Sequence, residues 1–201
     1  MSSTTETVGL RERNKLRRRE QITDAALRLF AERGFDGVTI EQIADAAEVS
    51  RRTFFRYFAR KEDVIVAWKE QMADELRAAL AERPEQEAPL DAVHRALATV
   101  AAGYAERPEL TLGLMRLFEG GPKLHTGAEY EDWDVVLADG IARRMRVDAA
   151  RDATPRLIAT VGFAVLTATI ETWAADGGKD DLVALLDGGF AELRRVTAAA
   201  D

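Results

Sequence analysis

The stretch from Thr39 to Phe58 carries the start signals of two short helices separated by a bend. Thr39 and Gln42 fit a capping box, in which the threonine hydroxyl accepts from the Gln42 amide and the glutamine side chain reaches back. After the bend, Ser50 is a favourable N-cap for a helix over residues 51–58. Two helices of about two turns joined by a bend of roughly three residues predict a helix-turn-helix.

The rest of the chain also shows helical periodicity. Between Glu12 and Arg33 apolar residues recur three and four positions apart, and Gly34 suits the left-handed end of that helix. No run alternates with period two, and Ala, Leu, Arg and Glu outnumber β-branched and aromatic residues, so we predict an all-α protein of about nine helices. The predicted helices cover residues 12–33, 40–47, 51–58, 61–83, 90–106, 108–119, 128–146, 153–175 and 180–198.

The charges divide the chain into two parts. Residues 10–61 contain thirteen Arg or Lys against eight Asp or Glu, residues 62–201 contain fifteen against twenty-six, and the net charge is −7. A basic first quarter beside an acidic remainder favours one module that meets a polyanion and one that does not. We therefore predict a disordered tail over residues 1–10, a helix-turn-helix domain over 11–60 and a second helical domain over 61–201.

The helix predicted over residues 51–58 has two different faces. Phe54 and Phe58 lie four positions apart and are expected to pack inward on the earlier helices. The other face gathers Arg51, Arg52, Phe55, Arg56 and part of Tyr57. A DNA major groove accepts a helix, and guanidinium groups pair with guanine edges or phosphates. The alternative, arginines that merely solvate a helix, leaves the capping box, the bend and the local positive charge unconnected.

Residues 18–68 closely resemble the DNA-binding module of TetR-family transcriptional regulators. The shared patterns are A-x-x-L-F-x-x-x-G-F at 26–35, T-x-x-x-I-A at 39–44, V-S at 49–50 and Y-F-x-x-K-E at 57–62. The resemblance implies that phosphates are contacted by Thr39, Ser50, Thr53, Tyr57 and Lys61. It also implies that the bases are read by Arg51, Arg52 and Arg56.

Three positions depart from the family pattern. Many members have glycine where Arg52 stands, and tyrosine is common at Phe55, which here lacks a hydroxyl for phosphate. Serine often caps the fourth helix at the position of Arg60, so that cap must come from elsewhere or be absent. The basic run over residues 11–19 has two readings, an arm that enters the minor groove or follows phosphates, and a frayed, solvated helix start.

The last two predicted helices have wide apolar faces. By the resemblance, they meet their symmetry mates in a four-helix interface, where Gly188 and Gly189 allow close approach. Such a homodimer would place two recognition helices about 34–36 Å apart on a palindrome of double-stranded DNA.

The resemblance also implies a small-molecule pocket that controls DNA affinity. The pattern E-R-P-E-L at 106–110, followed by L-M-R-L-F, resembles the mycofactocin-associated branch, which implies an acyl-CoA-like effector and a positive pocket mouth near Arg116 or Lys123. Either this pocket or the ordinary core accounts for the large apolar residues of the central helices, which are Tyr104, Met115, Phe118, Leu124, Trp133, Phe163, Ile170 and Trp173.

Several other functions lack their signatures. The chain has no cysteine, and His94 and His125 do not have metal-ligand spacing, so we expect no metal and no cofactor. It has no phosphate-binding loop, dinucleotide motif or nucleophile elbow, so we expect no enzyme. The N-terminus does not resemble a secretory signal, and the longest apolar run, residues 157–170, is shorter than the ~20 residues of a spanning helix. We therefore expect a cytoplasmic protein with no membrane partner.

These observations together predict a sequence-specific DNA-binding regulator, a repressor released by a small apolar or acyl-CoA-like effector. The alternative is a structural or partner-binding helical dimer that binds DNA and has no effector.

Overall fold

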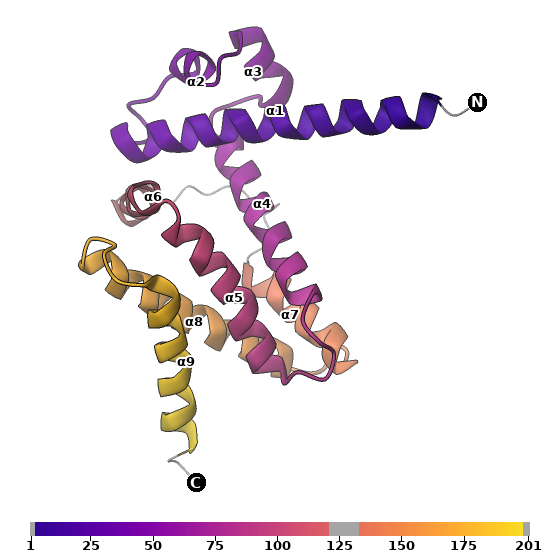
Figure 1. The fold of residues 1–201 in the computed structure, drawn as a ribbon, viewed down its shortest axis with the longest axis vertical. Helices are drawn as coiled ribbons and strands as arrows, with labels where there is room; N and C mark the ends of the chain where they lie inside the picture. Colours follow the sequence, from indigo (N-terminus) through magenta and orange to yellow (C-terminus); the bar gives the residue numbers. More distant parts are fainter. Residues whose placement is uncertain (1–2, 121–132, 199–201) are drawn as a thin grey trace. The chain divides into compact units, whose positions relative to one another are not determined.

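The computed structural model describes residues 3–120 and 133–198, without the side chains of 3–8, 10, 11 and 117–120. Over these residues the regular structure is nine α-helices and no strand, which confirms the all-α prediction (Figure 1). The helices are α1 (Ser3–Arg33), α2 (Ile40–Ala46), α3 (Arg51–Tyr57), α4 (Glu62–Ala81), α5 (Pro89–Ala105), α6 (Pro108–Gly120), α7 (Trp133–Met145), α8 (Thr154–Ala175) and α9 (Leu182–Ala198).

Helix α1 is longer than the sequence pattern indicates. Residues 3–10, for which a disordered tail is predicted, are the first part of α1, which continues beyond α2 and α3 (Figure 1). No proline and a single glycine, Gly9, occur within α1. Once a helix has formed, each added residue gains one hydrogen bond without a new nucleation cost, so an uninterrupted segment extends it.

The predicted helix signals at α2 and α3 are confirmed. The Gln42 amide donates to Thr39 Oγ1 at 3.3 Å, and the Thr39 amide donates to Gln42 Oε1 at 2.9 Å. Ser50 Oγ accepts from the Thr53 amide at 3.1 Å at the start of α3. Between the two helices, Glu48 adopts a left-handed φ of 52° and reverses the chain.

The inward face of α3 is also confirmed. Phe54 and Phe58 are 0% and 2% exposed, and their ring centroids lie 5.6 Å apart. Ile22 and Phe30 of α1 and Ile43 of α2 are buried as well. This apolar core fixes which side of the seven-residue helix α3 remains in solvent.

The chain forms two compact units. One comprises the described parts of residues 1–69 and 113–126, and the other comprises the described parts of 70–112 and 127–201. Helix α4 contributes to both units, and its 20 residues include neither glycine nor proline. In the first unit α6 approaches α1 closely, since a Cβ on Gly113 would lie 2.5 Å from Ala31 Cβ. The domain boundary at residues 60/61 stays a prediction.

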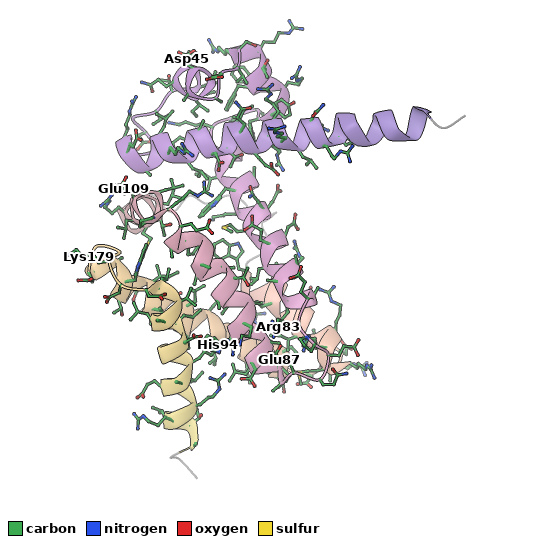
Figure 2. The ribbon with its side chains drawn as sticks, viewed as in Figure 1. Asp45, Arg83, Glu87, His94, Glu109 and Lys179 are labelled. Carbon is green, nitrogen blue, oxygen red and sulfur yellow. The ribbon has the colours of Figure 1, made fainter. Side chains whose placement is uncertain are left out.

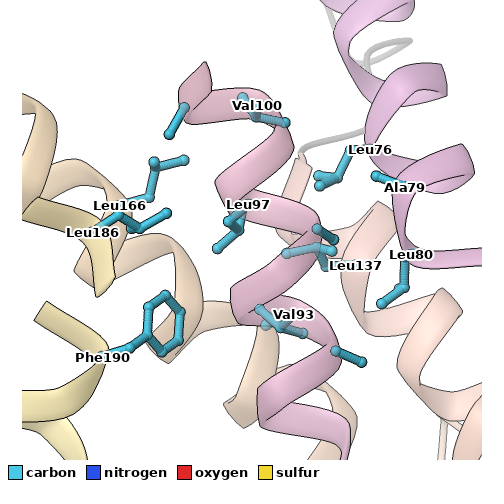
Figure 3. Packing of buried hydrophobic residues seen from close by; sticks show 14 of the residues in the cluster. Leu76, Ala79, Leu80, Val93, Leu97, Val100, Leu137, Leu166, Leu186 and Phe190 are labelled. Carbon is cyan, nitrogen blue, oxygen red and sulfur yellow. The ribbon is translucent and has the colours of Figure 1, made fainter. Parts of the chain in front are cut away.

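Helix α5 is central to the second unit. It packs against α7, α8 and α9. Figure 3 shows Val93 and Leu97 of α5 between Phe190 and Leu186 on one side and Leu80 and Leu137 on the other. The core of this unit is therefore built from helices that are distant in sequence.

Helix α8 is apolar for a helix with so much exposed surface. By length and composition it is the one described helix that qualifies as a candidate membrane span. Its most apolar 18-residue window has a mean hydropathy of 1.5, and 28% of that window is buried. It packs against α5, α7 and α9, as a helix of a helical domain does. Its remaining exposed apolar residues call for another explanation.

Candidate nucleic-acid interface and ligand pocket

The exposed face of α3 contains the cations and rings that the sequence indicates. Arg51, Arg52 and Arg56 are exposed, and Phe55 is 44% exposed. The Phe55 ring packs edge-on against Phe54 at 5.7 Å, which supports it from below. The arrangement is a convex ridge of guanidinium groups around an apolar ring.

The three arginines differ in how far they are engaged. Arg51 Nη1 lies 3.0 Å from Glu41 Oε1, and both side chains are more than half exposed, so this ion pair is weak. The Arg56 guanidinium lies 5.1 Å from the centroid of the Tyr57 ring, and Tyr57 is half-buried. The Arg52 guanidinium has no hydrogen bond or ion pair to any residue that the structure describes. The guanidinium donors of Arg52 and Arg56 are thus available to DNA, whereas Glu41 competes with DNA for Arg51.

The hydroxyl groups predicted to contact phosphates retain donors. Ser50 Oγ and Thr53 Oγ1 lie 2.9 Å apart, and this bond uses one of their two hydroxyl hydrogens. Thr39 Oγ1 accepts from Gln42, so its own hydrogen is not used in the capping box. Each site can therefore donate to an anion without loss of its cap.

Lys61 is held within the protein. Its Nζ donates to the carbonyl oxygens of Phe35 at 2.8 Å and Val38 at 3.2 Å, and it lies 4.3 Å from the centroid of the Phe35 ring. Two of its three N–H donors therefore fix the α1–α2 connection. A phosphate contact by Lys61, which stays a prediction, has the third donor available.

No serine directly precedes α4, and Asp63 in its first turn binds the backbone of the connection that leads into it. Its Oδ2 accepts from the backbone amides of Ala59 at 3.0 Å and Arg60 at 2.9 Å. Asp63 is not among the residues predicted from the sequence, although an aspartate in the first turn of a helix is a recognisable signal. The α3–α4 connection is thereby fixed without a hydroxyl.

The basic segment of α1 is helical and largely exposed. Arg13, Lys15 and Arg17 are exposed, Arg18 Nη1 donates to Gln21 Oε1 at 3.0 Å, and the Arg19 guanidinium lies 5.7 Å from the Phe58 ring. Both readings of this run, a DNA-contacting arm and a solvated helix start, stay open.

Five of the eight residues predicted for the effector pocket belong to the core cluster of the second unit or pack against it, and their role in a pocket stays a prediction. Trp173 is 1% exposed, and its indole N–H donates to the Asp180 carbonyl oxygen at 2.9 Å, as expected of a core residue. The Trp133 and Phe163 rings lie 6.1 Å apart, and both pack against the core, as do Tyr104 and Ile170. Met115 is partly buried. The Phe118 side chain, Lys123, Leu124 and His125 lie outside the described residues, and Arg116 is exposed.

A cavity of about 620 Å³ lies elsewhere in the second unit, between the C-terminal halves of α4 and α7 and the α4–α5 connection. None of the six predicted pocket residues with a described side chain lines it. Its walls combine apolar side chains with five arginines: Leu76, Arg77, Leu80, Ala81, Arg83, Glu85, Gln86, Val136, Leu137, Gly140, Arg143, Arg144, Met145 and Arg146. The clustered arginines at 143, 144 and 146 are the sequence signal for this site.

Two of these arginines hold the cavity wall together. Arg144 donates to the carbonyl oxygens of Arg83 at 3.0 Å, Glu87 at 3.3 Å and Pro84. Arg83 makes two hydrogen bonds to the Glu87 carboxylate, at 2.8 and 2.9 Å (Figure 2). The Arg83 hydrogen bond is the main reason that the pKa of Glu87 is lowered, and Glu87 raises the pKa of Arg83 in turn.

A polar network joins α5 to α9. His94 is 7% exposed, stacks on Phe190 at 4.2 Å and lies 2.6 Å from Asp187 Oδ1 through Nε2. Arg194 Nη2 lies 3.5 Å from His94 Nδ1 and forms an ion pair with Asp91. Because a guanidinium only donates, this contact fits the tautomer with hydrogen on Nε2. His94 is thus a packed core residue.

Both parts of the chain match known families. Residues 22–67 match the family model for bacterial regulatory proteins of the tetR family, and residues 87–198 match that for the MftR C-terminal domain. The transcriptional regulator TcmR of Streptomyces glaucescens is 40% identical over 175 residues, which are 82% of this chain and 76% of that protein. MftR of Mycobacterium tuberculosis, described as a mycofactocin biosynthesis transcriptional regulator, is 29% identical and covers 77% of this chain and 79% of its own.

Solved structures agree with these matches. Thermus thermophilus FadR, a TetR-family repressor in complex with lauroyl-CoA, has a TM-score of 0.51 and 27% identity over 86% of this chain and 91% of its own. A TetR-family regulator from Streptomyces coelicolor has a TM-score of 0.62 and 26% identity over 92% and 83%. From the α2–α3 geometry and these matches we conclude that the chain belongs to the TetR family of DNA-binding transcriptional regulators.

Proposed function

We propose that this protein is a cytoplasmic homodimer that binds a palindromic operator through α3 and represses transcription until a small apolar or acyl-CoA-like effector releases it. The observation that supports the DNA half is the exposed ridge of α3. Phe54 and Phe58 hold the helix from below, so that its arginines are presented outward. A convex cationic helix matches the width and charge of a major groove.

Within this proposal the exposed residues divide by role. Arg51, Arg52 and Arg56 read base edges, since a guanidinium pairs with guanine O6 and N7. Phe55 packs against sugars or thymine methyl groups. Phosphates are contacted by Thr39, Ser50, Thr53, Tyr57 and the remaining donor of Lys61, which sets the register of the helix.

The dimer is proposed to form through α8 and α9. Leu157 is 63% exposed and Val196 55%, a large apolar exposure for residues of two adjacent helices. A Cβ at Gly188 would meet nothing within 4 Å, so this position leaves room for a partner helix. Gly189 has another role, because a Cβ there would lie 2.9 Å from Val165 Cγ1 of the same chain.

The effector half of the proposal rests on the relatives and on the cavity. Lauroyl-CoA is the ligand named for the Thermus thermophilus repressor. The cavity between α4 and α7 offers space for a ligand in the size range of small-molecule sites. A helical DNA-binding dimer with no effector is the alternative, and it predicts that no ligand changes DNA affinity.

Operator selection tests the DNA half. We expect the purified protein to enrich a palindrome from a random duplex library of roughly 30 base pairs, and binding to weaken steeply with salt. Arg151 is an exposed arginine of the α7–α8 connection, so Arg151→Ala is the matched control for arginine-to-alanine substitutions on α3. Enrichment of no sequence, or of a site without twofold symmetry, would contradict the proposal.

The effector half is tested separately on the selected duplex. Lauroyl-CoA and a panel of apolar compounds should include one that raises the melting temperature of the protein through mass action and also dissociates the duplex. If compounds stabilise the protein without any effect on DNA affinity, the repressor-release proposal is wrong and the effector-free dimer is favoured.

A further inference from the structure

The cavity between α4 and α7 is cationic at its rim and apolar in its wall. Its lining includes five arginines against one glutamate, in a chain whose net charge is −7. We propose that it binds an amphiphilic anion, with a carboxylate or phosphate head at Arg143 and Arg146 and an apolar chain against the leucines. This inference rests on the proposed effector function and gives that effector a place and a chemistry.

The arginines around the cavity are not equivalent. Arg83 and Arg144 are committed to the wall through Glu87 and three carbonyl oxygens. The Arg143 side chain is exposed and has no hydrogen bond or ion pair to any residue within 3–120 and 133–198. Arg146 Nη2 is 3.7 Å from Glu85 Oε2, and both side chains are more than four-fifths exposed. Arg77 forms an ion pair with Asp74 at 2.6 Å. Arg143 and Arg146 are therefore the groups available to an anion.

The backbone at Arg146 supports a role for its charge. Arg146 follows α7 with a φ of 57°, and the Val147 amide donates to the Ala142 carbonyl oxygen at 3.1 Å. Glycine is the usual residue at such a left-handed helix end, because a Cβ is strained there. An arginine at this position accepts that strain, and it places a guanidinium at the cavity rim.

A second observation comes from Arg144. Its Nε is buried and has no hydrogen-bond partner among the described residues. Buried N–H groups are nearly always paired, so this donor in the cavity wall lacks the acceptor that a fully satisfied wall would have. An anionic head supplies such acceptors, whereas a purely apolar ligand does not.

The apolar wall comes from both helices. Leu76 and Leu80 of α4 and Val136 and Leu137 of α7 line the cavity. At Gly140 the helices approach closely, since a Cβ there would lie 2.5 Å from Leu80 Cδ2. The cavity thus offers an apolar surface next to cations. This combination favours an amphiphile over an anion that has no apolar part.

The test compares the wild type with Arg143→Gln/Arg146→Gly, in full-length protein and without DNA. Glycine at 146 relieves the left-handed strain, so the double variant should fold and melt at or above the wild-type temperature. The ligands are lauroyl-CoA, laurate and free coenzyme A, titrated by calorimetry. Arg151→Gln is the control, because it removes an exposed arginine that does not line the cavity.

We expect lauroyl-CoA to bind the wild type and the control equally, and the double variant at least about tenfold more weakly, since charge-assisted hydrogen bonds are lost. Laurate binding with the same arginine dependence assigns the head to a carboxylate, whereas binding of lauroyl-CoA alone assigns it to phosphates. Unchanged affinity of the double variant, binding of free coenzyme A alone, or no binding at all would overturn the inference.

The proposed function is judged by a separate readout, duplex release measured by fluorescence anisotropy. If lauroyl-CoA releases the duplex equally well from the double variant, the proposed repressor function is supported and the proposed binding site is wrong. Arginine-dependent binding without release supports the site and contradicts the repressor.

Discussion

The two arginine clusters of this acidic protein share a charge and differ in shape. On α3, Arg51, Arg52 and Arg56 stand on a convex helix over a buried phenylalanine pair. Between α4 and α7, five arginines surround a concave cavity of about 620 Å³. A groove in a duplex can enclose the first, whereas only a small molecule can enter the second. Positive charge favours anions at both clusters, and the local shape determines whether the anion is a duplex or a small molecule.

The clusters also differ in their internal acids. The α3 ridge has one nearby carboxylate, Glu41, in a weak exposed pair with Arg51. At the cavity, Glu87 holds Arg83 by two hydrogen bonds, whereas the Arg143 side chain of α7 has no ion pair with a described residue. A few carboxylates therefore decide which arginines remain available.

The largest expected effect comes from removal of the support under the convex cluster. Phe54→Ala should destabilise the protein by about 3–5 kcal/mol, because a fully buried ring is replaced by a cavity, and should abolish DNA binding. Chemical denaturation and anisotropy measure both. The control is Phe55→Ala, whose ring is 44% exposed and whose loss should weaken DNA binding with little effect on stability. Equal destabilisation by the two would refute the assigned faces.

A crossed pair of substitutions tests whether the clusters are independent. Arg52→Ala should lose about 1–3 kcal/mol of discrimination at one base position, because a bidentate contact disappears, and should leave lauroyl-CoA affinity unchanged. Arg143→Gln should weaken lauroyl-CoA binding and leave base discrimination unchanged. Operator-variant titrations and calorimetry provide the readouts. A loss of both activities in either variant would show that the division by shape is wrong.

A smaller effect is expected from the carboxylate next to the ridge. Glu41→Gln should strengthen operator binding by about 0.5–1 kcal/mol, because it releases Arg51 and removes a negative charge near phosphate. The gain should shrink in high salt. Weaker binding of the variant would mean that the ion pair positions Arg51 and does not compete for it. Glu32→Gln, an exposed carboxylate of α1, is the control.

The smallest effect concerns the acid that holds the cavity wall. The Arg83 guanidinium lowers the pKa of Glu87, with smaller effects from Arg144 and Arg95, so the carboxylate stabilises the fold above its ordinary pKa of 4.5. This contribution is lost as the pH falls through the lowered value. Wild type should therefore be slightly more stable than Glu87→Gln near about pH 7, and the difference should vanish in acid. Thermal melts across that range measure it, and a difference that persists in acid contradicts the assignment.

Local signals allowed the first unit to be predicted closely. The capping box at Thr39 and the cap at Ser50 involve residues three positions apart, so the sequence alone places both helix starts. The inward faces of Phe54 and Phe58 follow from helical spacing. The start of α1 was not predicted, because the polar residues 3–10 show no burial pattern that marks a helix.

Long-range contacts explain what the sequence left open. The cavity joins residues 76–86 to residues 136–146, and the His94–Asp187 contact spans 93 positions, so no window of sequence contains them. The role of Lys61 shows the same limit. Its side chain reaches carbonyl oxygens 23 and 26 positions away, which a family pattern at residues 57–62 does not reveal.

Helices α4 and α6 each belong to both units, and the unit with α3 includes residues from two separate stretches of chain. A chimera that takes its DNA specificity from a relative therefore needs more than a single junction placed after α3. A chimera would have to import the first turns of α4 together with the Gly113 segment that fits against Ala31, or the transplanted module would lose its matched surface.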